Sequence, residues 1–223
     1  MGTFRFPAAT VNFLTDLRAH NEKSWFDANR GRYQAEYLEP AKEFVEEIGP
    51  ELVGLVPGIR AEPWVRGSIF RINRDIRFSK DKRPYKDHLD FWFWEGDRAA
   101  AVAGLFLRVS PDAVLVGAGA HGFDNDQLST YRAAVVDPAS GPELAAVVSE
   151  LDANGYEVGG ETFKRVPRGF DATAAVERLL RHSALYAHTQ LPVRAASSAG
   201  FVDTVLADWR TFLGLYNWLT EHV

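Results

Sequence analysis

The sequence predicts an α+β fold, with a central mainly antiparallel sheet flanked by N-terminal and C-terminal helices. Apolar residues recur every three or four positions near both ends of the 223-residue chain, as in amphipathic helices. Residues 87–123 instead hold short runs rich in valine, leucine and aromatic side chains, as in strands. No internal repeat or Ser/Gly linker interrupts the chain. We therefore expect a single globular domain over residues 1–223.

The first sixty residues predict two helices. One apolar stripe spans residues 13–17, and a second runs at helical spacing through residues 41–55. Pro40 suits the first turn of the second helix, where a missing backbone N–H costs little. Gly49-Pro50 should break or kink the same helix.

The middle of the chain predicts three strands joined by short turns. The turn signals Glu95-Gly96-Asp97 and Ser110-Pro111-Asp112 divide residues 87–123 into three apolar runs. Connections this short favour an antiparallel meander. Gly117 and Gly119 would let another backbone or a bulky aromatic side chain approach the last strand closely.

Helical patterns return after residue 124. We expect helices at about residues 126–136, 141–153 and 173–182, and a short hairpin across Gly159-Gly160. The clearest helix lies at 198–221, where apolar side chains recur at intervals of three and four residues and form one wide stripe.

Composition excludes several classes of function. The chain contains no cysteine, so disulfides, thiolate catalysis and cysteine metal sites are excluded and a cytoplasmic location is natural. The longest apolar run, residues 99–107, has about half the length of a membrane-spanning helix, and the N-terminus carries no export signal, so we expect no membrane contact. The histidines show no firm ligand spacing, so we predict no metal site.

Two motifs match known sites only in part. GAGAHG at residues 117–122 has the spacing of a dinucleotide-binding loop, but the strands before it look antiparallel and no helix opens at its third glycine. We expect His121 in this stretch to be hydrogen-bonded and structural. Asp87, His88 and Asp90 form the tightest acid and histidine group, although alternation on a strand would turn Asp87 away from the other two.

Positive charge gathers between residues 71 and 86. The segment carries seven cations against two aspartates, 7 − 2 = +5, while the whole chain is −5 and the remainder is therefore −10. The cations are Arg71, Arg74, Arg77, Lys80, Lys82, Arg83 and Lys86. Because nucleic-acid binding usually needs a broad basic surface, this local charge better suits a small anion, an acidic peptide or an internal salt-bridge network.

Within this segment we expect a strand at about residues 68–78 and, because Pro84 lacks a backbone donor, an exposed loop at 80–86. Alternation would place one set of side chains on an apolar face: Phe70, Ile72, Arg74, Ile76 and Phe78. Arg74 is the exception on that face. An unpaired buried charge costs about 3–5 kcal/mol, so Arg74 must meet either a carboxylate or a ligand.

The same segment carries a family resemblance. RINRDIRFSKDKRPYKDH, residues 71–88, is similar to the signature of a bacterial and fungal family catalogued as domain of unknown function 2461, and FKRVPRGFD at 163–171 resembles its second marker. The similarity runs from FLTDLRAHNEKSWFDANR near the N-terminus to the C-terminal helix. The family has no agreed catalytic residues, so the resemblance implies no activity. It does imply that four residues accompany the first motif: Lys164, Arg165, Pro167 and Gly169.

The leading functional prediction is a pocket for a small phosphorylated or carboxylated ligand. Its ligand-binding residues would be Arg71, Arg74, Arg77, Lys80, Lys82, Tyr85, Lys86, Lys164 and Arg165. If the protein is an enzyme, Asp75 or His121 would be the general acid or base. The sequence specifies neither a cofactor nor an oligomeric state.

Two alternatives stay open. The basic loop could form an interaction module that binds an acidic peptide or partner protein, with no need for a concave pocket. It could also bind single-stranded nucleic acid together with the aromatic residues at 91–94, since aromatic faces stack on any base. The acidic overall charge makes nucleic acid the less favoured partner.

Overall fold

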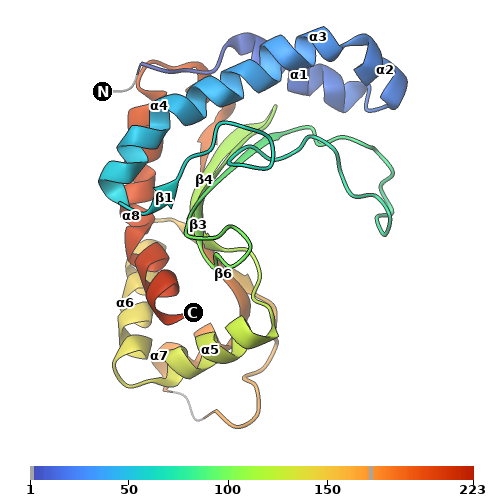
Figure 1. Cartoon of the computed structure of the whole chain (residues 1–223). Coiled ribbons are helices and arrows are strands. Elements are labelled where there is room, and N and C mark those ends of the chain that lie inside the picture. Colours follow the sequence, from blue (N-terminus) through green and yellow to red (C-terminus); the bar gives the residue numbers. More distant parts are fainter. Residues whose placement is uncertain (1–2, 171–172) are drawn as a thin grey trace. The chain divides into compact units, whose positions relative to one another are not determined.

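The computed structural model of the chain describes residues 3–170 and 173–223 (Figure 1). Within these residues the predicted α+β class is confirmed, with helices at both ends and a six-stranded antiparallel sheet in the order β1-β2-β3-β4-β6-β5. The elements are α1 (Ala8–Ala19), α2 (Lys23–Ala28), α3 (Arg30–Arg32), the π-helical turn η1 (Tyr33–Leu38), α4 (Glu39–Leu55), β1 (Ile59–Arg60), β2 (Leu89–Glu95), β3 (Gly104–Val109), β4 (Ala113–Ala120), α5 (Asn125–Val136), α6 (Ser140–Ala153), β5 (Glu157–Glu161), α7 (Ala174–Glu177), the 3-10 turn η2 (Leu179–Arg181), β6 (His182–Pro192), the 3-10 turn η3 (Val193–Ser197) and α8 (Phe201–His222). No helix in the described part of the chain is long and apolar enough to cross a membrane.

The chain divides into two compact units, each assembled from three segments. Unit 1 comprises Met1–Phe93, Phe106–Val116 and Gln190–Ala207, and unit 2 comprises Trp94–Leu105, Gly117–Thr189 and Asp208–Val223. Strands β2, β3, β4 and β6 and helix α8 each contribute residues to both units. The single domain expected over residues 1–223 stays a prediction.

Aromatic side chains form the core of unit 1. The ring of Phe44 in α4 lies 4.9 Å from the ring of Phe91 in β2, between centroids. Phe6 contacts Phe44 at 5.5 Å and Phe201 at 5.7 Å, and all four rings are buried. Burying a side chain of this size contributes about 1.5–3 kcal/mol. The apolar stripe predicted at 41–55 therefore holds α4 against β2.

Helix α4 continues through Gly49-Pro50, so of the break or kink expected there the break is wrong and the kink stays a prediction. Ile48 and Leu52, on either side, are fully buried and fix the helix by packing. Gly49 permits a close approach, since a Cβ on it would lie 3.2 Å from the Cβ of Ala61. Packing thus outweighs the helix-breaking tendency of this pair.

The predicted meander is confirmed, with β2, β3 and β4 adjacent in the sheet. Gly96 in the first turn has φ +68°, a conformation that favours glycine. In the second turn the Ser110 hydroxyl donates to the Ala113 carbonyl oxygen at 2.9 Å and accepts from its N–H at 3.1 Å. Gly119 has φ +127°, and a Cβ on it would overlap the Leu185 carbonyl oxygen, which confirms the expected close approach.

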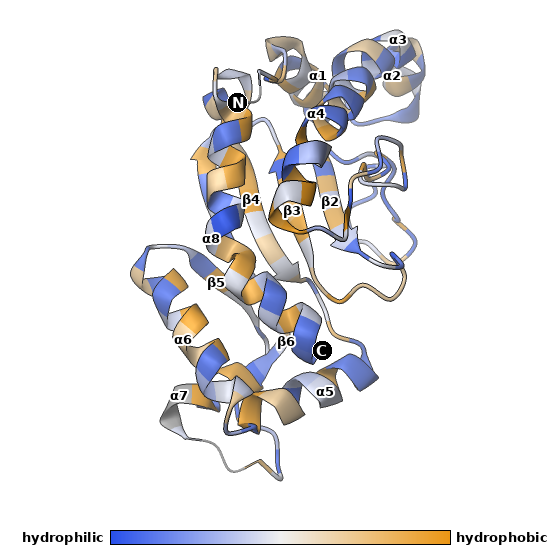
Figure 2. Ribbon diagram, turned by 60° about the vertical axis from the view of Figure 1, so that its left-hand side comes forward, coloured by the Kyte–Doolittle hydropathy of each residue, from blue (hydrophilic) through white to orange (hydrophobic). Residues whose placement is uncertain are grey.

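In the core of unit 2, buried indole groups of α8 join this helix to strand β4 and to helix α6. Trp209 Nε1–H donates to the Gly117 carbonyl oxygen at 3.1 Å, and Trp218 Nε1–H donates to that of Ser140 at 2.9 Å. Figure 2 shows hydrophobic and hydrophilic residues in turn along α8, as expected for an amphipathic helix. The prediction of helix at 198–221 is confirmed by α8, and those at 126–136 and 141–153 by α5 and α6.

The hairpin expected across Gly159-Gly160 is wrong, because both glycines lie inside β5, which pairs antiparallel with β6. A Cβ on Gly159 would lie 2.6 Å from the Tyr186 ring, and one on Gly160 would overlap the Ala184 carbonyl oxygen. The glycines therefore serve close strand pairing rather than a turn.

The helix expected at 173–182 is shorter than predicted. It divides into α7 and η2, and His182 already opens β6. Residues 171–172 lie outside the described part of the chain. Strand β6 itself was not predicted.

Candidate functional site

The basic arm, defined as residues 70–88, belongs to unit 1 and runs as a long irregular loop (Figure 1). The regular strand expected at 68–78 is therefore wrong. Two backbone hydrogen bonds join the first limb of the arm, residues 70–76, to the returning limb, residues 82–88. The Arg74 N–H donates to the Pro84 carbonyl oxygen at 2.9 Å, and the Lys86 N–H donates to that of Ile72 at 2.8 Å. Pro84 has no N–H with which to extend the pairing, so the limbs meet only at isolated positions.

Side-chain alternation holds along the first limb and then fails. Ile72 is buried and Arg74 is half-buried, while Arg71 and Asn73 between and beside them are exposed. Phe78, expected on the apolar face, is 95% exposed. The chain bends at residues 77–78, which ends the alternation.

Arg74 meets a carboxylate from its own arm. Its Nη1 lies 2.8 Å from Asp81 Oδ2 and also donates to the Arg83 carbonyl oxygen at 3.0 Å. Arg83 Nη2 lies 2.7 Å from the same Asp81 oxygen. Hydrogen bonds from the side chain and backbone of Arg83, and then from Arg74, hold the pKa of Asp81 well below its usual range.

Arg77 is likewise paired within the arm. It binds Asp75 through two nitrogens, with Nη2 at 2.7 Å from Oδ2 and Nε at 3.0 Å from Oδ1. These contacts lower the pKa of Asp75, mainly through the Arg77 side chain. A carboxylate with a lowered pKa is a weaker proton acceptor, which disfavours Asp75 as a general base, and its catalytic assignment stays a prediction. His121, the other catalytic candidate, lies in unit 2 with its ring centroid 5.1 Å from that of Tyr186.

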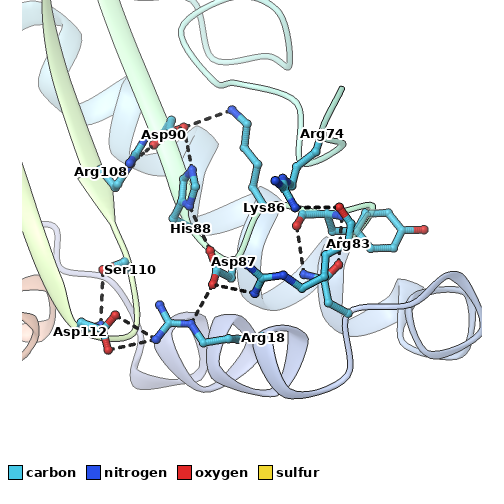
Figure 3. Close-up of polar contacts among 12 residues, drawn as sticks. Arg18, Arg74, Arg83, Lys86, Asp87, His88, Asp90, Arg108, Ser110 and Asp112 are labelled. Carbon is cyan, nitrogen blue, oxygen red and sulfur yellow. Dashed lines mark hydrogen bonds and ion pairs between the residues drawn. The ribbon is translucent and has the colours of Figure 1, made fainter. Parts of the chain in front are cut away.

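Asp90, at the start of β2, is the most buried carboxylate of this region, with 9% exposure. Arg108 Nε lies 2.6 Å from its Oδ1, and Lys86 Nζ lies 3.1 Å from its Oδ2 (Figure 3). Burial acts to raise the pKa of Asp90, but hydrogen bonds from His88 and Arg108 outweigh burial and lower it. The carboxylate therefore stays ionised, and through Lys86 it holds the C-terminal end of the arm against β2.

His88 lies between two carboxylates. Its Nδ1 is 3.2 Å from Asp87 Oδ1, and its Nε2 is 3.2 Å from Asp90 Oδ2. The expectation that Asp87 points away from His88 is wrong, because residues 87–88 form a bend before β2 and strand alternation does not apply there. Each imidazole nitrogen of His88 therefore faces one carboxylate oxygen.

Asp87 extends the charged contacts to α1 and to the β3–β4 turn. Arg18 Nε lies 2.8 Å from Asp87 Oδ2, and Arg83 Nη1 lies 3.9 Å from the same oxygen (Figure 3). Arg18 also reaches Asp112, with Nη1 at 2.9 Å from Oδ2.

These residues form one charged network in unit 1. Its members are Arg18, Arg74, Arg83, Lys86, Arg108, Asp81, Asp87, Asp90, Asp112 and His88. Of the seven cations read from the sequence, four pair with carboxylates, namely Arg74, Arg77, Arg83 and Lys86, and the other three form no ion pair with any described residue. Sequence reasoning missed Arg18, Arg108 and Asp112, which come from distant elements. No group of side chains in residues 3–170 and 173–223 is arranged to hold a metal ion.

The remaining predicted ligands in the arm differ in exposure. Arg71 and Lys80 are exposed and form no ion pair with any described residue, and Lys82 Nζ donates to the Ile76 carbonyl oxygen at 3.0 Å. Tyr85 is buried, and its ring stacks on Phe26 with centroids 4.2 Å apart. Tyr85 therefore anchors the arm to α2.

Lys164 and Arg165 lie in unit 2, within an exposed segment that we call the second loop, residues 162–170. Together with Arg168 they form no ion pair among the described residues. Phe163 is 39% exposed, and the Arg132 guanidinium lies 5.0 Å from its ring centroid. A pocket shared between the second loop and the arm stays a prediction.

Fold and site together define an α+β protein with a basic arm in which carboxylates pair with four of the seven cations. The chain belongs to the family described as conserved hypothetical protein DUF2461, whose family model matches residues 9–218. No curated protein and no solved structure matches the chain.

Proposed function

We propose that the basic arm is a docking surface for an acidic segment of a partner protein, with Phe78 as the apolar anchor. The observation that carries the proposal is the 95% exposure of Phe78. Burying such a side chain contributes about 1.5–3 kcal/mol, which the isolated protein forgoes. Aromatic residues are enriched at protein interfaces and among the side chains that dominate binding energy.

Ion pairs hold the chain on both sides of Phe78. Before it, Arg77 is bound to Asp75, and after it, two arginines share Asp81. Because these contacts already form in the free protein, the arm loses less conformational freedom on binding than an unstructured loop would.

Positive charge surrounds the anchor. The Arg77 guanidinium lies 5.8 Å from the Phe78 ring centroid and its side chain is 77% exposed. Lys80, two residues further on, is exposed and forms no ion pair with described residues. An apolar centre with a cationic rim is complementary to an apolar side chain flanked by glutamates or aspartates.

Long nucleic acid fits this distribution less well. The sequence outside residues 71–86 sums to −10, which would repel a polyanion that extended beyond the arm. A short acidic segment would contact the arm alone. The predicted cytoplasmic location is compatible with such a partner and stays a prediction.

The small-anion prediction is retained as a second candidate for the second loop. Within the arm, Arg74, Arg77 and Lys86 already bind carboxylates, so an incoming phosphate would have to displace them. Lys164 and Arg165 have no such partner among the described residues, which favours a phosphate or carboxylate ligand there.

The test is fluorescence anisotropy with a labelled peptide of alternating glutamate and leucine. We expect Phe78→Ser to weaken binding by about 30-fold, as for a central interface residue. Lys80→Glu should slow association and weaken binding by about fivefold through charge repulsion.

Two matched variants control for general effects. Val53→Ser removes another exposed apolar side chain of unit 1, and Lys23→Glu reverses another exposed lysine. Both should bind the peptide as the unmodified protein does. Equal binding by Phe78→Ser would refute the anchor, and tighter, steeply salt-dependent binding of oligothymidylate would assign the arm to nucleic acid.

A further inference from the structure

Unit 2 contains a cavity of about 340 Å³ that none of the assignments above uses. It lies between the turn after β2 and the last turns of α8, and its lining includes Glu95, Asp97, Tyr216, Thr220 and residues 100–103. Its size is at the lower end of the range for small-molecule sites, about 300–1,000 Å³. The cavity therefore suits a ligand of a few non-hydrogen atoms.

One wall of the cavity presents an oriented carboxylate. The Tyr216 hydroxyl donates to Glu95 Oε2 at 2.9 Å, and Tyr216 is 1% exposed. Thr220 Oγ1 in turn donates to the Tyr216 carbonyl oxygen at 2.9 Å. Burial, and then the neighbouring Glu95, raise the pKa of Tyr216, so its hydroxyl keeps the proton that it donates. Glu95 Oε1 takes no hydrogen bond from any described residue.

The charge of the lining is negative. Asp97 is a second carboxylate, and its Oδ1 accepts from the Ala99 N–H at 3.0 Å, which fixes the turn. No lysine or arginine lines the cavity, and Arg98 instead has its guanidinium 4.7 Å from the centroid of the Trp94 ring. An anionic ligand would be repelled here, whereas a cation would pair with Glu95.

Another part of the cavity lining is apolar. Residues 100–103, Ala-Ala-Val-Ala, line it with short apolar side chains. Small side chains leave room for a narrow aliphatic chain, and contact with them removes its apolar surface from water. A cationic head and a short apolar stem would therefore each meet a complementary wall.

We propose that this cavity binds a short aliphatic primary ammonium ion, with Glu95 as its ion-pair partner and Tyr216 as the residue that positions Glu95. Each N–H of the ammonium group is a donor, and Glu95 Oε1 is the available acceptor. The site is independent of the docking surface proposed for the arm, since every residue in it belongs to unit 2.

The experiment is a titration of the full chain, labelled at alanine methyl groups, followed by NMR. The probes are n-butylammonium, the neutral n-butanol and the anionic butyrate, which share the same four-carbon chain. We expect saturable shifts of the Ala101 and Ala103 methyl signals with n-butylammonium and a Kd of about 1 mM or below. Affinity should fall at least about tenfold for n-butanol, and butyrate should produce no shift at these methyl groups.

Matched variants separate the ion pair from folding. Glu95→Gln keeps an oxygen for the Tyr216 hydroxyl but removes the charge, and should weaken n-butylammonium binding at least about tenfold. Glu150→Gln, an exposed glutamate of the same unit that forms no ion pair with described residues, should bind as the unmodified protein does. The other alanine methyl signals report folding in each variant. Equal affinity for n-butylammonium and n-butanol, unchanged binding by folded Glu95→Gln, or no shift at about ten times the expected Kd would each overturn the proposal.

Discussion

The basic arm and the second loop look alike as sequences, but their charges are used differently. In the arm, Arg74, Arg77 and Lys86 each lie within 3.1 Å of an aspartate oxygen. In the second loop, Lys164 and Arg165 form no ion pair with any described residue. A count of basic residues therefore measures the charge that a segment carries and says little about the charge that it can offer to a ligand. The four predictions below test the ion pairs of the arm, including those with Asp90, or the absence of ion pairs in the second loop.

The largest effect on the free energy of unfolding is expected at Asp90, the most buried carboxylate that pairs with a cation of the arm. Asp90→Asn removes the charge that pairs Arg108 and Lys86. Breaking a buried pair costs about 3–5 kcal/mol, and we expect about 2–3 kcal/mol here because Arg108 is half exposed. Urea denaturation measures the loss. Asp112→Asn, at a side chain that is 72% exposed, is the control and should cost less than about 1 kcal/mol. Equal costs for the two variants would contradict a special role for Asp90.

Acid should reproduce part of this loss. The folded pKa of Asp90 lies below its unfolded value of about 3.9, so the ionised carboxylate adds stability above that pH and loses it as the pH falls further. We expect the free energy of unfolding to decline below about pH 4 more steeply in the unmodified protein than in Asp90→Asn. Denaturation curves from about pH 5 downwards test this difference, and parallel curves would show that Asp90 does not contribute.

Freeing cations of the arm from their carboxylates, so that they resemble the cations of the second loop, should increase the affinity of the arm for anions. Asp81→Asn releases Arg74 and Arg83 from a shared carboxylate. We expect pyrophosphate to bind about fivefold more tightly to this variant, measured by calorimetry. Asp27→Asn, which frees only the exposed Arg30, is the matched change outside the arm and should have a smaller effect. No gain with Asp81→Asn would show that charge release alone does not make a site.

The smallest effect on stability is expected in the second loop. Replacing Lys164, Arg165 and Arg168 by alanine should change the free energy of unfolding by less than about 0.5 kcal/mol, because these exposed side chains form no ion pair with described residues. If the second loop holds a small anion, the same variant should lose any thermal stabilisation by pyrophosphate. Retained stabilisation would place the anion site elsewhere.

Local periodicity made most of the fold predictable. The helices at both ends and the meander of β2, β3 and β4 follow from spacing and turn residues that lie within a few positions of each other. The hairpin expected at Gly159-Gly160 failed because glycine also permits close strand pairing, and the two uses look alike in one sequence. Strand β6 was missed for a related reason. Its partner β5 contains those glycines, and because they indicate a turn, no strand was expected there for β6 to pair with.

The candidate site was predictable only in part. Alternation correctly indicated that Arg74 lies on a half-buried face and needs a partner, but not that Asp81 of the same arm supplies it. The contact of Arg108 with Asp90 joins side chains of two strands, and no local pattern encodes it. Arg108 does stand out as an exposed cation in the buried strand β3, which is a signal that could have directed attention to a carboxylate beside it. The exposure of Phe78 depends on a bend that the sequence does not mark.

The interleaving of the two units has a consequence for synthesis of the chain. Unit 1 includes residues 190–207 and unit 2 includes residues 208–223, so unit 1 is complete only after residue 207 has left the ribosome and unit 2 only after residue 223. Helices α1 and α4 therefore leave the ribosome before the residues that cover their apolar side chains have been synthesised. Contacts between residues distant in sequence also generally slow folding. We therefore expect nascent chains of this protein to need shielding by a chaperone, and a stop codon placed anywhere before residue 190 to yield a fragment that cannot complete either unit.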